Sequence, residues 1–121
     1  MGKRILIVDD EEHIRELIAK FLTKHGFTVR LAANGDQGIE TVRKEIPDLV
    51  FLDILMPGRN GLDVLKQLKE EFPELPVIIF SALHEEETAK EAIRLGAYDY
   101  MTKPFSLDRL LKDFIQRILG E

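Results

Sequence analysis

The chain has 121 residues, of which 45% are hydrophobic and 32% charged, and 17 basic against 22 acidic residues give a formal net charge of −5. This composition excludes a disordered chain and predicts one folded domain over residues 1–121, and the absence of cysteine excludes disulfides and thiolate-ligated metals. Its apolar stretches are too short to cross a bilayer and no Lys/Arg run exceeds two residues, so we expect a cytoplasmic protein that contacts neither membrane nor nucleic acid directly.

Short apolar runs alternate with amphipathic segments along the chain. The strand candidates are Arg4–Val8, Thr28–Ala32, Leu49–Leu52, Val77–Phe80 and Asp99–Thr102. Apolar residues recur at helical spacing between or after them, at Ile14, Leu17, Ile18, Phe21 and Leu22; at Ile39, Val42 and Ile46; at Leu62, Leu65, Leu68 and Phe72; and at Leu107, Leu110, Leu111, Phe114, Ile115 and Ile118. The alternation predicts an α/β fold with a doubly wound, five-stranded parallel sheet and five helices.

Punctuating residues mark the ends of several of these elements. Gly26 and Gly96 stand where helix C-termini are expected, and Ser106 is placed to cap the last helix at its N-terminus. The pair Asn34-Gly35 is typical of a turn.

The fourth helix, over residues 85–94, differs from the others in its small apolar face. Ala89, Ala92 and Ile93 are the apolar residues it offers to a core. Two interpretations stay open: a short surface helix, or a weakly held element that changes position during function.

Acidic residues end two of the most apolar runs. Asp9 and Asp10 follow Ile5-Leu6-Ile7-Val8, and Asp53 follows Leu49-Val50-Phe51-Leu52. If the two strands are parallel neighbours, the carboxylates converge, and each pair at about 4 Å repels by about 4 kcal/mol at an effective dielectric of about 20. Such a cluster must take up a proton or a cation, and all-oxygen ligands favour Mg²⁺.

Two more polar residues end the fourth and fifth strand candidates on the same side. Ser81 follows the fourth apolar run and Lys103 follows the fifth. Each has an ordinary structural explanation, and Asp10 could simply favour a helix N-terminus. Together, however, a carboxylate nucleophile, a divalent cation, a lysine and a hydroxyl are typical of a phosphoryl-transfer site.

These motifs resemble those of the receiver domain of bacterial two-component response regulators, as in the single-domain chemotaxis and sporulation regulators. The resemblance covers residues 4 to about 119 and rests on Ile5–Asp10, Asp48–Asp53 with Met56-Pro57-Gly58 and Gly61, Ser81-Ala82, and Lys103-Pro104-Phe105. It implies a flavodoxin-like sheet of order 2-1-3-4-5.

The resemblance also implies a set of residue roles. Asp53 matches the aspartate that receives a phosphoryl group from a kinase phosphohistidine. Asp10 matches a direct Mg²⁺ ligand, Asp9 its water-mediated neighbour, and the Leu55 carbonyl the third protein ligand. Lys103, before a cis peptide bond to Pro104, matches the lysine that contacts the phosphoryl group.

Further implied roles concern the switch. Ser81 matches the switch hydroxyl, the Ala82 N–H faces the phosphoryl oxygens, and Tyr100 matches the switch aromatic, a role that Tyr98 could fill less well by spacing. The apolar Leu55, where the family is often polar, predicts hindered water attack on the acyl phosphate, to which Leu83 could add.

The resemblance implies a switch rather than an enzyme with an external substrate. The expected partners are a histidine kinase or phosphotransfer protein and a downstream target or output domain, with a monomer or a weak phosphorylation-dependent dimer. The expected contact surface is the fourth helix, fifth strand and fifth helix, including Lys90, Glu91, Arg94, Tyr100, Lys112 and Asp113.

The sequence supports two other functions of this architecture less well. A flavin-binding electron carrier needs an uncharged phosphate loop after the first strand, where this chain has Asp9, Asp10, Glu11 and Glu12. An aspartate-nucleophile phosphatase generally carries a second acid two residues after the nucleophile, where this chain has Leu55.

Overall fold

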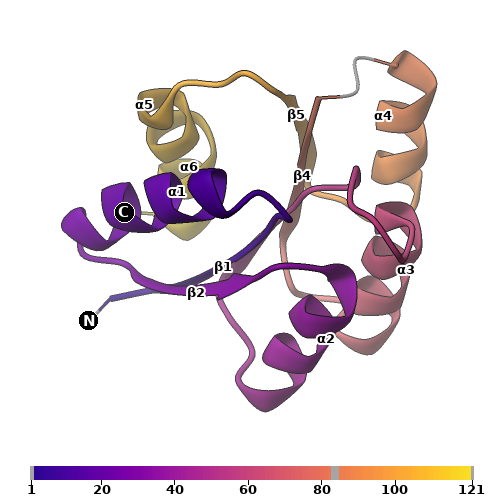
Figure 1. Ribbon diagram of the computed structural model, residues 1–121, viewed down its shortest axis with the longest axis horizontal. Coiled ribbons are helices and arrows are strands. Elements are labelled where there is room, and N and C mark those ends of the chain that lie inside the picture. The colour runs from indigo at the N-terminus through magenta and orange to yellow at the C-terminus, as the bar shows by residue number, and fades with distance from the viewer. Residues whose placement is uncertain (1, 83–84, 121) are drawn as a thin grey trace.

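The structure, a computed structural model, describes residues 2–82 and 85–120 and contains one five-stranded parallel sheet of order β2-β1-β3-β4-β5 (Figure 1). The strands are β1 (Arg4–Val8), β2 (Thr28–Ala32), β3 (Leu49–Leu52), β4 (Val77–Ser81) and β5 (Asp99–Thr102). The predicted flavodoxin-like topology is therefore confirmed. β4 runs one residue further than predicted, so that it includes Ser81.

Helices cover both faces of the sheet. They are α1 (Glu12–Lys24), α2 (Gly35–Lys44), α3 (Gly61–Glu71), α4 (Glu86–Arg94) and a last helix whose consecutive parts are α5 (Leu107–Arg109), the π-helical η1 (Leu110–Ile115) and α6 (Gln116–Leu119). α1 and the last helix lie on one face, and α2, α3 and α4 lie on the other (Figure 1). Among the described residues, no helix is both long enough and apolar enough to cross a membrane.

The side chains of the inner strands divide between two apolar cores. Ile5 and Ile7 of β1 pack with α1 and η1, whereas Leu6 and Val8 pack with α2 and α3. All four residues of β3 are buried. Because burying one such side chain contributes about 1.5–3 kcal/mol, the positions of β1 and β3 are strongly fixed, and so is the edge of the sheet at which they end.

Most predicted helix ends are confirmed. Gly26 and Gly96, which follow α1 and α4, have φ of 92° and 107°, a conformation that glycine adopts without a steric penalty. Ser106 caps the last helix by accepting a hydrogen bond from the Arg109 N–H at 3.0 Å. The turn predicted at Asn34-Gly35 is wrong, because the Asn34 side chain accepts from the Gln37 N–H and caps α2.

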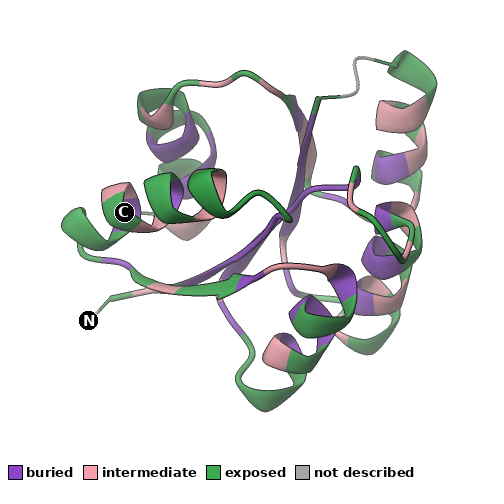
Figure 2. Cartoon of the chain, in the orientation of Figure 1, coloured by how far each residue is buried: buried purple, intermediate pink, exposed green. Residues whose placement is uncertain are grey.

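Two predicted apolar faces are smaller than expected. α2 ends at Lys44, so Ile46 lies beyond the helix and is 54% exposed, and Pro47 follows it. In α4 only Ala92 is buried, whereas Ile93 is 49% exposed. Figure 2 shows α4 as a mostly exposed helix at the side of the molecule. Ala92 is therefore the one residue of α4 that is fully buried in the core.

Candidate functional site

The predicted polar residues meet at the carboxyl edge of the sheet. Asp9 follows β1, Asp53 follows β3, Ser81 ends β4 and Lys103 follows β5. Backbone hydrogen bonds extend the strand pairing to this edge, because the Asp53 N–H donates to the Val8 carbonyl at 2.9 Å and the Lys103 N–H to the Ser81 carbonyl at 2.7 Å. The side chains thus start from backbone positions that the buried sheet fixes.

Three carboxylates form one cluster. Asp9, Asp10 and Asp53 each offer an oxygen, and these oxygens all lie within 4.8 Å of one another. Asp9 is fully buried, Asp53 is 3% exposed, and Asp10 is exposed. Leu55, whose N–H bonds Asp53, is 47% exposed, and Ala82, which follows Ser81, is also exposed. Asp53 therefore lies at the base of the cluster, with Asp10, Leu55 and Ala82 nearer the solvent.

Lys103 joins the two buried carboxylates. Its Nζ lies 2.8 Å from Oδ2 of Asp9 and 3.1 Å from Oδ2 of Asp53, and 4.9 Å from the centre of the Phe80 ring. Burial alone would lower the pKa of Lys103, but the hydrogen bond to Asp9 and the charges of both aspartates outweigh burial and raise it. Lys103 is consequently a cation at neutral pH, and the peptide bond before Pro104 is cis, as predicted.

The charge of Asp53 is only partly compensated. Burial raises the pKa of Asp53 above its usual value, against the hydrogen bond from the Leu55 N–H to its Oδ1 at 2.9 Å and the attraction of Lys103. The carboxylate of Asp9 adds to the increase. One lysine therefore leaves the three-carboxylate cluster with excess negative charge.

The donor set fits Mg²⁺. Every candidate ligand is an oxygen, the carboxylates converge on one point, and a divalent cation would cancel the charge that Lys103 leaves over. Sulfur and imidazole ligands, which softer metals prefer, do not enter the cluster that these described residues form.

Two residues that the sequence interpretation missed support the first strand end. The Glu11 N–H donates to Oδ1 of Asp9 at 2.9 Å, and the Glu11 carboxylate lies 3.9 Å from Nζ of Lys103. Arg15 reaches back from α1 so that its Nη1 donates to the Asp9 carbonyl at 2.7 Å. Its position one helical turn after Glu11 was the available signal, because that spacing places a side chain on the same face of the helix, tilted back toward its N-terminus.

The side chains of Ser81 and Tyr100 contact each other. Ser81 is fully buried and is a hydrogen-bond partner of the half-buried Tyr100 side chain. Burial raises the pKa of Tyr100, and the hydrogen bond to Ser81 opposes that increase. Tyr98 is 52% exposed. Of the two tyrosines, Tyr100 is the one whose side chain reaches the site.

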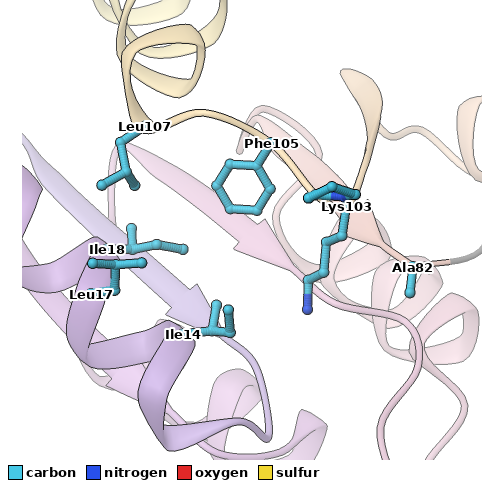
Figure 3. Close-up of a pocket in the computed structure, with 8 residues that line it drawn as sticks. Ile14, Leu17, Ile18, Ala82, Lys103, Phe105 and Leu107 are labelled. Carbon is cyan, nitrogen blue, oxygen red and sulfur yellow. The ribbon is translucent and has the colours of Figure 1, made fainter.

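An apolar pocket of about 380 Å³ adjoins the acidic cluster. Its lining comes from α1, the end of β4 and the segment after β5: Ile14, Leu17, Ile18, Ala82, Lys103, Pro104, Phe105 and Leu107. Figure 3 shows the α1 side chains facing Phe105 and Leu107 across the pocket, with Lys103 between them and Ala82. Leu83, which the sequence placed near the acyl phosphate, lies outside the described residues.

Residues 5–115 match the family model of the response regulator receiver domain. The chain belongs to this family. As a receiver domain it is a phospho-accepting signalling switch of two-component systems, and the flavodoxin and phosphatase alternatives are set aside.

Receiver domains of known proteins are similar in sequence and structure. The transcriptional regulatory protein DltR of Streptococcus agalactiae is 44% identical over 108 residues, which are 89% of this chain and 48% of DltR. The receiver domain of NtrX from Brucella abortus superposes with a TM-score of 0.88 at 43% identity, covering 96% of this chain and 98% of that one. A CheY-like receiver from Methanospirillum hungatei gives a TM-score of 0.94 at 27% identity, over 99% and 96%.

The chain spans only part of its curated relatives. It matches about half of DltR, and about a quarter of NtrX from Azorhizobium caulinodans, which is 42% identical over 113 residues. The part that this chain shares with them is the receiver domain, and the match does not extend to the rest of those proteins.

Proposed function

We propose that Asp53 accepts a phosphoryl group from the phosphohistidine of a histidine kinase or phosphotransfer protein, in a Mg²⁺-dependent reaction. The observation that carries this proposal is the convergence of the Asp9, Asp10 and Asp53 carboxylates with Lys103 bonded to two of them. Asp9, Asp10, Asp53 and the Leu55 carbonyl would hold the ion. Bound Mg²⁺ supplies charge neutralisation between the incoming phosphoryl oxygens and the acceptor.

The residues of the chain divide the work of the transfer. A carboxylate oxygen of Asp53 forms the new O–P bond while the P–N bond to the donor imidazole breaks, and the imidazole leaves with the electron pair of that bond. Lys103, freed from part of its pairing with Asp53, would bind a phosphoryl oxygen as a fixed cation. The Ser81 hydroxyl and the Ala82 N–H are the proposed donors to the remaining oxygens.

The Ser81–Tyr100 contact suggests how phosphorylation is read out. A phosphoryl group on Asp53 would compete for the Ser81 hydroxyl that now bonds Tyr100. The position of the Tyr100 ring would then depend on phosphorylation, and α4, whose one buried residue is Ala92, would shift with it.

Two surfaces are proposed for partners. The apolar pocket beside Lys103 suits the donor protein, because it places an apolar contact next to the acceptor. The output surface is that of α4, β5 and η1, where Lys90, Arg94, Lys112 and Asp113 are exposed and Glu91 and Tyr100 are half-buried. We propose that it contacts a downstream protein, an output domain or a second copy in a weak phosphorylated dimer, in the cytoplasm.

Incubation with acetyl phosphate and Mg²⁺ tests the function. The wild-type protein is expected to gain about 80 Da, the mass of one phosphoryl group. Asp53→Ala and wild type with a chelator are expected to gain nothing, as measured by intact mass spectrometry. A wild-type protein that stays unmodified while a control receiver domain is labelled would contradict the proposal.

Leu55 is expected to lengthen the lifetime of the acyl phosphate. Its exposed apolar side chain stands beside Asp53, where a polar side chain could orient an attacking water. We expect Leu55→Asn to lose its phosphoryl group roughly tenfold faster, less than a well-placed general base achieves. Leu31→Asn, an exposed leucine on β2, is the matched control. An unchanged or slower rate in Leu55→Asn, followed by mass spectrometry after donor removal, would refute this role.

A further inference from the structure

A chain of polar side chains runs along α2 and α3 and ends on the loop after Asp53. Arg43 of α2 bonds Glu71 of α3 through Nε and Nη2, at 2.9 and 2.7 Å. Glu71 accepts from Nε2 of Gln67 at 3.0 Å, and Oε1 of Gln67 accepts from Nη2 of Arg59 at 2.6 Å. The other guanidinium nitrogen of Arg59, Nη1, donates to Asp36 at the start of α2 at 3.1 Å.

The order of these bonds gives Arg59 a preformed partner. Hydrogen bonds from Arg43 and then Gln67 lower the pKa of Glu71 to about 2, so Glu71 is an anion at neutral pH. Because the amide nitrogen of Gln67 donates to the Glu71 carboxylate, the amide oxygen of Gln67 faces Arg59. A planar guanidinium can satisfy Gln67 and Asp36 at once, which a lysine cannot do with the same geometry.

Arg59 lies in the loop between β3 and α3, which begins at the proposed metal site. The segment begins at Asp53, passes through Leu55, and ends at Asn60, whose Oδ1 accepts from the Leu62 N–H and caps α3. It closes tightly, because a Cβ on Gly61 would lie 2.2 Å from Cα of Ile54. Only Met56, Pro57 and Gly58 separate Leu55 from Arg59, so the position of Arg59 constrains the backbone that carries Leu55.

We propose that Arg59 is a positioning residue for the magnesium site, an inference that rests on the proposed function. By tying the loop to α2 and α3 together, Arg59 keeps the Leu55 carbonyl directed at the point where the carboxylates converge. Its pair with Asp36 is half-exposed and contributes little to folding stability, because solvent screens such pairs. The role of Arg59 is therefore geometric, and it is measured as metal affinity.

Calorimetric titration with Mg²⁺, without any phosphoryl donor, tests the proposal. We expect Arg59→Leu to weaken Mg²⁺ binding about tenfold, in the range found for residues that orient metal ligands. Gln67→Leu is expected to weaken it less, and the double variant no more than Arg59→Leu, because both act through one contact. Arg30→Leu removes a more exposed arginine that pairs with Glu45, and it is expected to bind as wild type.

Each outcome separates the claims. Wild-type affinity in Arg59→Leu would overturn the inference and leave the proposed function intact. A wild-type protein that binds no Mg²⁺ would overturn both. Arg59→Leu and Arg30→Leu are expected to have the same stability in urea unfolding. If Arg59→Leu does not fold, Arg59→Lys replaces it, because lysine keeps the charge and loses one of the two bonds. Arg59→Lys is expected to bind Mg²⁺ more weakly than wild type, and wild-type affinity would contradict the role.

Discussion

Replacing Lys103 with methionine is expected to lower the free energy of unfolding by about 3 kcal/mol at pH 7 in a chelator, the low end of the cost of removing one partner of a buried ion pair. Methionine keeps most of the side-chain volume but leaves the buried Asp9 and Asp53 without the cation that bonds both. Proton uptake by the cluster limits the loss. Urea unfolding, followed by circular dichroism, measures the effect.

Magnesium and a surface lysine provide the controls for this variant. Excess Mg²⁺ is expected to stabilise Lys103→Met more than wild type, because the ion replaces the missing positive charge. Lys112→Met removes an exposed lysine 3.4 Å from Asp108, and we expect it to change stability by less than about 0.5 kcal/mol. Equal stability of Lys103→Met and Lys112→Met in the chelator would mean that Lys103 does not hold the cluster.

Replacing Asp53 with asparagine is expected to raise stability at neutral pH by about 1 kcal/mol in a chelator, a typical size for a single substitution. Because burial raises the pKa of Asp53 in the folded state, its ionisation costs folding free energy. That cost is absent below the unfolded-state pKa of about 3.9, grows as pH rises, and is complete above the folded-state pKa.

The pH dependence of stability distinguishes the ionisation cost of Asp53 from the effect of removing any other negative charge. Wild type and Asp53→Asn are expected to be equally stable at the acidic limit of folding and to diverge towards pH 7, as measured by urea unfolding across this range. Glu16→Gln, which neutralises an exposed acid on α1, is expected to show no such divergence. A variant that is less stable than wild type at pH 7 in the chelator would contradict the excess negative charge of the cluster.

The fold was largely predictable because the inner strands β1, β3 and β4 are buried on both sides. Continuous apolar runs such as Leu49–Leu52 have few alternative positions in a small α/β domain, and the polar residues that end them therefore meet at one edge. Predictions failed where local propensity competed with packing. Asn34 has the composition of a turn but caps α2, and Ile46 continues a helical pattern that Lys44 ends.

The site residues missed from the sequence are those that act through long side chains. Arg15 contributes through a bond to the Asp9 carbonyl, and Arg59 through Gln67 and Asp36. Charged residues on exposed helices and loops usually lie in solvent, so neither position is distinguished by residue type alone. Only the packing of α2 against α3, which no single segment encodes, brings the partners of Arg59 together.

The most direct test is to locate the phosphoryl group. After labelling with acetyl phosphate and Mg²⁺, borohydride reduction converts an aspartyl phosphate to homoserine, and peptide mass spectrometry identifies the residue. Homoserine at position 53, formed in Mg²⁺ and absent in a chelator, is the result expected from a metal-assisted acceptor at the base of the carboxylate cluster. Homoserine at another aspartate, or equal labelling of residue 53 without divalent ions, would contradict it.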